Sequence, residues 1–286
     1  MKYALAAVAA LVLCSGTASA QSFLDGWTGE GNLGGGVTTG NTDTVDVGIA
    51  LKVGKEFGPW QVTADGGFDF GQVDGEDNRR RWWVGSQVSR DFTDRLYGFG
   101  DVSYEEDDFS GFDSRLFLGV GAGYHVFKEK PLLWAVEVAP GYRRSVTSDS
   151  ILAAAVAPVL DPDDPTVTLI PAVPAQVAPG DTFNDFAVRG SSKFAYHFNE
   201  NVIFTNDTDV VWSDLSTQTV NTAALTAQLT ERISGRVSFQ VRHETDPPAG
   251  FVNTDTATRV SVVYACLLYT SPSPRDQRGS RMPSSA

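Results

Sequence analysis

The sequence contains few of the residues that form disulfides, thiolate metal sites and catalytic triads. Among 286 residues there are two cysteines, Cys14 and Cys266, and three histidines. Both cysteines lie in terminal stretches, so the region between them can form neither a disulfide framework nor a thiolate metal site. A Gly-x-Ser-x-Gly nucleophile elbow is also missing. These absences predict a protein without a catalytic site, a metal or a cofactor.

Basic residues and long apolar segments are scarce as well. Lys and Arg number 22 against 35 Asp and Glu, which gives a formal net charge of −13. Nucleic acid is therefore excluded as a partner, because binding it needs clustered Lys and Arg. The apolar stretch Ala4–Leu13 is too short for a membrane-spanning helix, and no long amphipathic helix pattern is found.

The two ends of the chain differ from its middle. Residues 1–20 have the features of a signal peptide: Lys2, a short apolar core and the small-residue site Ala18-Ser-Ala20 before Gln21. Residues 266–286 depart from the pattern of the rest and resemble translated sequencing-adapter read-through, so we interpret them as a non-native tail. The expected folded region is residues 21–265, as one domain.

Between these ends, the main signal is strict alternation of apolar and polar residues. In Thr44–Val53, valine, isoleucine and leucine occupy every second position, and polar or small residues occupy the others. Side chains alternate across a strand, so this stretch has one apolar and one polar face. Ten residues is about the length that one tilted strand needs to cross a bilayer. This pattern predicts a strand of a membrane barrel with its apolar face toward lipid.

The pattern recurs along the chain and predicts an all-β fold, a single closed antiparallel transmembrane barrel of about 12 strands. In the fifth strand both parities carry apolar residues, and the ninth is weak. The expected strands are residues 27–37, 44–53, 60–70, 80–90, 95–104, 115–126, 133–143, 186–198, 202–212, 220–229, 236–244 and 257–265.

The connections favour a barrel in a bacterial outer membrane. Short connections alternate with longer, mostly acidic ones, as short periplasmic turns alternate with external loops. Aromatic residues concentrate near both ends of the strands, which is typical of the two membrane interfaces. Residues 151–183 are expected to form a long external loop insertion that folds over or into the mouth. The longer connections are expected at 71–79, 105–113, 145–183 and 245–256.

Several motifs, in a fixed order, resemble the salt-induced outer membrane protein family, the YdiY-like proteins of unknown function. The resemblance implies an outer-membrane barrel without an established enzyme activity, in contact with lipid and lipopolysaccharide. It also implies insertion by the barrel assembly machinery, although Cys266 stands where such barrels carry a terminal aromatic. The motifs are Trp27–Gly34, Thr38–Thr42, Leu96–Tyr97, Asp107–Asp113 with Arg115, Gly119–Tyr124 and Gly141–Arg143.

The polar parity of the expected strands defines a set of charged residues that would line the lumen. One interpretation is a narrow channel that selects small solutes or ions by charge and width; its link to salt or osmotic response is what the resemblance implies. The other is a network of salt bridges that closes the barrel. Both stay open at this point. The residues are Asp46, Lys52, Asp65, Asp69, Arg81, Asp101, Arg115, Glu137, Arg143, Arg189, Lys193, Arg236, Arg242, Glu244 and Arg259.

Two alternatives to a non-enzymatic membrane barrel are considered. A lipid-modifying enzyme would need a His–Ser pair at the lipid surface, and only His243 has the outward parity for one. A soluble periplasmic barrel would bind an apolar ligand inside, with its apolar parities facing inward. The acidic stretch Glu105–Asp108 is interpreted as a solvated loop, with a cation site as the alternative.

Overall fold

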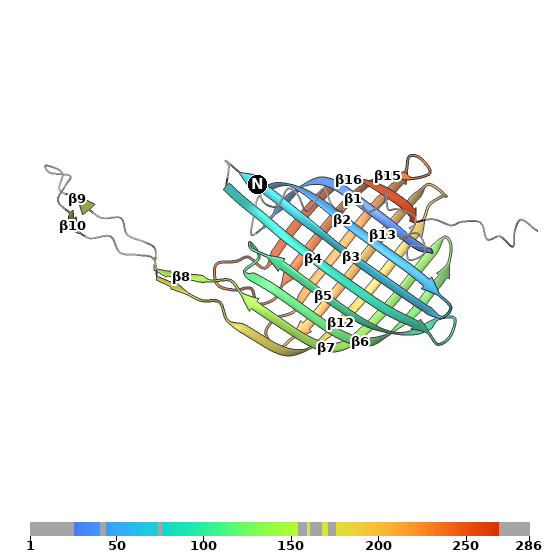
Figure 1. Cartoon of the computed structure of the whole chain (residues 1–286), viewed down its shortest axis with the longest axis horizontal. Helices are drawn as coiled ribbons and strands as arrows, with labels where there is room; N and C mark the ends of the chain where they lie inside the picture. Colours follow the sequence, from blue (N-terminus) through green and yellow to red (C-terminus); the bar gives the residue numbers. More distant parts are fainter. Residues whose placement is uncertain are drawn as a thin grey trace, which may run out of the picture.

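The computed structural model is a closed barrel of twelve antiparallel strands, tilted relative to the barrel axis (Figure 1). It describes residues 26–40, 44–73, 76–153, 159–160, 168–170 and 176–268. The barrel strands are β1 (Trp27–Thr39), β2 (Thr44–Phe57), β3 (Trp60–Val73), β4 (Glu76–Asp91), β5 (Leu96–Asp107), β6 (Phe112–Glu129), β7 (Leu132–Thr147), β12 (Thr182–His197), β13 (Val202–Ser213), β14 (Gln218–Gln228), β15 (Ile233–Glu244) and β16 (Thr254–Leu268).

Each barrel strand pairs with its neighbours in sequence, except that β7 pairs with β12 across the insertion between them. Pairing of β1 with β16 closes the cylinder. Closure leaves no sheet edge, so every strand has a hydrogen-bonding partner on both sides. The predicted fold and all twelve expected strands are confirmed.

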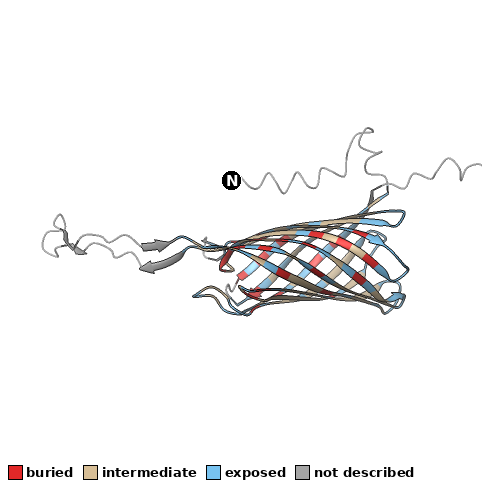
Figure 2. Cartoon of the chain, turned by 90° about the horizontal axis from the view of Figure 1, so that it is seen from below, coloured by how far each residue is buried: buried red, intermediate tan, exposed pale blue. Residues whose placement is uncertain are grey.

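Apolar side chains cover the outside of the barrel. Val120 is 69% exposed and Val260 is 65% exposed, whereas the carboxylates of Asp46 and Asp69 are buried inside. Buried residues recur along β5 and β6 with more exposed ones between them, as the period of two requires, and Figure 2 shows buried residues interspersed with exposed ones along the barrel strands. The alternative of a soluble barrel with an apolar interior is therefore wrong, because the apolar rows face outward.

The structure resolves the ambiguous parity of the fifth strand. Leu96 and Val102 on β5 face outward, and Tyr97 and Phe99 are buried inside against Ala139. Glycines on β6 make room for these rings, since a Cβ atom at Gly123 would overlap the Tyr97 side chain. Both faces of this strand carry aromatic residues, so the sequence alone did not decide which face lies against lipid. The glycines on β6 leave space in the lumen for the aromatic rings that face inward.

The two ends of the barrel are named here by their connections. At the turn end, neighbouring strands are joined by residues 58–59, 92–95, 130–131, 198–201 and 229–232. At the loop end, they are joined by residues 40–43, 74–75, 108–111, 148–181, 214–217 and 245–253. The expected long loops at 71–79 and 105–113 are wrong, because β3, β4, β5 and β6 continue into them. Only two loop-end connections are longer than the turns.

The insertion between β7 and β12 contains short strands that its sequence did not predict. β8 (Ser150–Ala153) pairs with β11 (Gln176–Ala178), and β9 (Val159–Leu160) pairs with β10 (Thr168–Ile170). Figure 1 shows these strands beyond the ends of β7 and β12, outside the bore. Residues 154–158, 161–167 and 171–175 lie outside the described residues, so the expected fold over or into the mouth stays a prediction. Strands this short are defined by backbone pairing alone, and they contain too few residues to show an alternation of apolar and polar side chains in the sequence.

The chain termini are described only in part. The predicted signal peptide, residues 1–20, lies outside the described residues, as do residues 269–286. Strand β16 continues through Cys266 to Leu268, which pairs with Trp27, beyond the expected end of the folded region at residue 265. Among the described residues, no helix has the length and apolarity needed to cross a bilayer.

Candidate functional site

A dense group of charged side chains fills the bore near the loop end. We call it the mouth network. Its members come from eight strands, whose side chains the closed sheet directs inward: β2, β3, β4, β5, β6, β7, β15 and β16. Eight of them were expected from sequence, and Arg79, Glu105 and Asp107 were not. The members are Asp46, Asp69, Arg79, Arg81, Glu105, Asp107, Arg115, Arg143, Arg242, Glu244 and Arg259.

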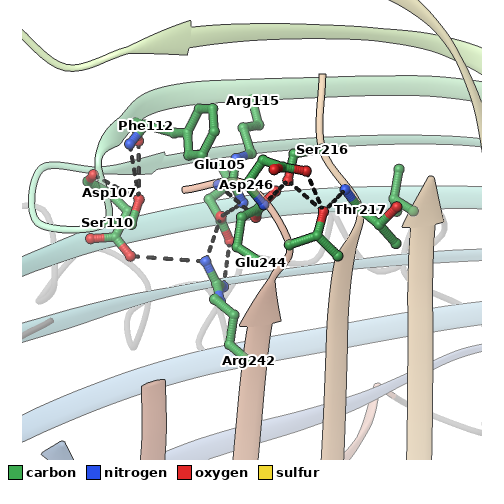
Figure 3. Close-up of polar contacts among 12 residues, drawn as sticks. Glu105, Asp107, Ser110, Phe112, Arg115, Ser216, Thr217, Arg242, Glu244 and Asp246 are labelled. Atoms are coloured by element: carbon green, nitrogen blue, oxygen red, sulfur yellow. Dashed lines mark hydrogen bonds and ion pairs between the residues drawn. The ribbon is translucent and has the colours of Figure 1, made fainter. Parts of the chain in front are cut away.

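The central contact of the mouth network crosses the bore. Arg242 Nη1 donates to Glu105 Oε1 at 2.8 Å, and Arg242 Nη2 donates to Glu105 Oε2 at 2.9 Å. Their strands, β15 and β5, lie six places apart in the closed order of twelve, so they face each other across the barrel. Arg81 Nη2 also donates to Glu105 Oε2, at 2.6 Å. Figure 3 shows Arg242 reaching Glu105 from the opposite wall.

A second contact ties β15 to the wall formed by β6 and β7. Arg115 Nη2 lies 3.0 Å from Glu244 Oε2, and both side chains are less than a tenth exposed. Arg143 Nη2 lies 4.0 Å from Glu244 Oε1, and Arg143 Nη1 donates to the Ser216 carbonyl at 3.3 Å. The contact between Arg115 and Glu244 lies beside the central one (Figure 3). The mouth is therefore crossed at two neighbouring places.

A third part of the network lies where the barrel closes. Arg259 Nη2 donates to Asp46 Oδ2 at 2.6 Å, and Arg259 Nη1 lies 2.8 Å from Asp69 Oδ1. Arg79 and Arg81 approach Asp69 to 3.6 and 3.7 Å. Buried charges are stable only when paired, because removing them from water costs several kcal/mol per ion. Six arginines face five carboxylates in the mouth network, so its formal charge is close to neutral.

A smaller group of charges lies deeper in the bore. Arg189 bridges Asp101 at 2.7 Å and Asp209 at 2.8 Å. Lys193 Nζ lies 2.8 Å from Glu137 Oε2. The other expected lumen residues stand apart: Arg236 pairs with Glu30 at 2.8 Å, and Lys52 and Asp65 are exposed, with no ion pair among the described residues.

The free space in the bore differs between the two ends. Beside the mouth network, a cavity of about 20 Å³ lies between Thr38, Arg79 and Arg242, which is close to the volume that one water needs. Toward the turn end, a cavity of about 380 Å³ has Lys193 and Asp207 in its lining. Of these two cavities, the one beside the mouth network is the smaller.

Sequence reasoning missed Arg79, Glu105 and Asp107 for one reason. The fourth strand was expected to begin at residue 80 and the fifth to end at residue 104, so all three fell in supposed loops. Glu105 and Asp107 share the parity of Asp101, and Arg79 shares that of Arg81. Extending each strand by its own alternation would have found them. The solvated-loop interpretation is therefore wrong for Glu105 and Asp107.

The histidines lie on three different strands and have unrelated contacts. His243 Nδ1 lies 2.9 Å from the Thr254 hydroxyl on the outer face. The His125 ring packs 4.9 Å from the Tyr97 ring, centroid to centroid, inside the bore. Among the described residues, no group of three His, Cys, Asp or Glu side chains is placed to hold a metal ion.

Comparisons with solved structures find other barrels. The NanC porin is 15% identical over 82% of this chain and 98% of that one, with a TM-score of 0.49. The translocator domain of the autotransporter NalP from Neisseria meningitidis is 12% identical over 86% and 92%, with a TM-score of 0.47. The COG4313 outer membrane channel from Pseudomonas putida F1 is 10% identical over 84% and 96%, with a TM-score of 0.48. Similarity at this level carries no functional information for this chain.

The sequence itself is informative at the level of the family. It matches no curated relative. Residues 31–266 match the family model described as "Protein of unknown function, DUF481", which confirms the resemblance drawn from the sequence motifs. The chain therefore belongs to the DUF481 family.

Proposed function

We propose that the protein is an outer-membrane channel for small ions or solutes, and that the mouth network is its constriction. The apolar exterior supports a position in lipid, since only a closed barrel or a helix satisfies its backbone hydrogen bonds there. The signal-peptide features at residues 1–20 support export to the outer membrane. Lipid, lipopolysaccharide and the barrel assembly machinery are its proposed partners on this account, and no enzyme activity is proposed.

One observation carries the proposal: the Arg242–Glu105 contact joins opposite walls of the bore. A constriction held by ion pairs differs from a packed apolar plug, because its strength depends on charge and ionic strength. The wider cavity toward the turn end gives solute a place to enter from that side. Charged side chains of both signs at this proposed constriction would select by field as well as by width.

Conductance is expected to rise more steeply than the salt concentration. Between 0.1 and 1 M KCl the Debye length falls from about 10 Å to about 3 Å, which weakens ion pairs that water can reach. We therefore expect more than a tenfold increase in single-channel conductance for this tenfold increase in carrier concentration. The measurement is single-channel recording of the purified full chain in planar bilayers.

Two results of that recording would contradict the proposal. A conductance strictly proportional to salt concentration would show that ion pairs do not set the width of the bore. The absence of conductance at every salt concentration, with insertion verified, would favour a closed envelope barrel. This second candidate function, a closed envelope barrel, is supported by the small size of the cavity beside the mouth network, about 20 Å³. A role in salt or osmotic response follows only if conductance depends on salt as expected.

A further inference from the structure

The outer face of β13 and β14 carries hydrogen-bonding side chains halfway along the strands. Asn206 Nδ2 donates to Asn221 Oδ1 at 3.3 Å, and Asn221 Nδ2 donates to Asn206 Oδ1 at 3.2 Å. Asn221 Nδ2 also donates to Thr208 Oγ1 at 2.7 Å. Trp212, on the same parity of β13, is 47% exposed on the outside. The three polar side chains therefore lie on the face that the rest of the barrel covers with apolar residues.

These side chains have hydrogen-bonding capacity left over. A carboxamide has two N–H donors and an oxygen acceptor with two lone pairs, and a hydroxyl has one donor. Among the described residues, the second N–H of Asn206 and the O–H of Thr208 have no acceptor. Lipid chains offer no hydrogen bonds, so unsatisfied polar groups there are costly. A second protein surface would satisfy them.

The residues beside these side chains are small enough for a second protein surface to approach the barrel closely. Thr208 is the cross-strand neighbour of Ser192 on β12, and Asn206 is that of Ala223 on β14. A Cβ atom built at Gly190 on β12 would meet nothing within 4 Å. Small residues of this kind let backbones approach within a membrane, where polar side chains then hydrogen-bond between the partners.

We propose that this surface, formed by Ser192, Asn206, Thr208 and Asn221 and named the amide patch, binds a second copy of this chain. Carboxamides both donate and accept, so one patch is complementary to itself around a two-fold axis. Phe204 and Trp212 flank the patch along β13, which places it at mid-strand. The partner must therefore also lie in the membrane. The inference rests on the membrane location in the proposed function and not on conductance.

The first test measures the oligomeric state of the full chain in lipid nanodiscs that can hold two barrels. We expect the unmodified protein to be dimeric and the double variant Asn206→Val and Asn221→Val to dimerise at least tenfold more weakly. Ser86→Val is the matched control, because Ser86 has outward parity on β4, six places from β14 in the closed order. A monomeric unmodified protein, or equal weakening by Ser86→Val, would overturn the inference.

The second test is cross-linking in native membranes after Cys266→Ser removes the remaining cysteine of the barrel region. A bismaleimide is expected to link Thr208→Cys into a covalent dimer and to leave Ser86→Cys monomeric. Cross-linking of Thr208→Cys to a different protein, or to nothing, would contradict a second copy as the occupant. Flotation with vesicles is measured first. A chain that does not float contradicts the proposed function, and one that floats as a monomer contradicts only this inference.

Discussion

Glu105→Ala is expected to open the mouth of the barrel and to raise single-channel conductance several-fold. Glu105 accepts hydrogen bonds from Arg242 on the opposite wall and from Arg81 beside it. Without this carboxylate, Arg242 keeps only the longer contact of its Nη1 with Asp107 Oδ2, at 4.0 Å, across the bore. The mouth network would also gain one net positive charge, so selectivity should shift toward anions. Both quantities come from planar bilayer recordings, the second from the reversal potential in a KCl gradient.

Asp65→Ala is the matched control for this prediction. It removes the same charge from the bore, but Asp65 is exposed and makes no ion pair among the described residues. Conductance should stay near that of the unmodified protein. If Glu105→Ala and Asp65→Ala raise conductance equally, charge in the bore matters and the crossing contact does not.

Asp69→Ala is expected to reduce the free energy of unfolding by about 3–5 kcal/mol, the usual cost of removing one partner from a buried ion pair. The Asp69 side chain is completely buried, and Arg259, Arg81 and Arg79 lie within 4 Å of it. Removing the carboxylate leaves these guanidinium groups close together with one buried counter-charge fewer, although Arg259 keeps its contact with Asp46 and Arg81 its contact with Glu105. Urea unfolding in lipid vesicles, followed by tryptophan fluorescence, measures the change.

The control for stability is again on β3. Asp65→Ala changes the same residue type, at the same parity of the same strand, where the carboxylate is exposed. Its unfolding free energy should change little, as is usual for surface substitutions away from a special contact. Equal destabilisation by the two variants would show that the burial of Asp69 contributes nothing.

The fold was predictable because alternation is a local property of the sequence. Val45, Val47 and Ile49 lie on one face of β2 whatever the rest of the chain does. Strand ends were less predictable: acidic residues such as Glu105 and Asp107 are typical of loops and are rare in strands. Here inward parity and arginine partners keep them in β5. The alternation was present in the sequence, but residue type obscured it.

The contacts of the mouth network could not be predicted. Glu105 and Arg242 are 137 residues apart, and their approach depends on the number of strands and on closure of the sheet. Parity predicts which face of the sheet a side chain lies on, but it does not predict which residues lie across the bore from it. The same limit applies to the amide patch. The ninth expected strand was weak by sequence, and only the register shows that Asn206 and Asn221 lie close enough to hydrogen-bond.

The central claim is that apolar side chains face lipid and polar side chains face the bore. It is tested most directly by spin labels at Val237, Ser238 and Phe239 on β15, in the Cys266→Ser chain reconstituted into liposomes. Val237 and Phe239 are 52% and 47% exposed on the outer face, and Ser238 has inward parity. Collision with oxygen, which concentrates in lipid, should be high at 237 and 239 and low at 238. The reverse order, or equal values at the three positions, would contradict the account.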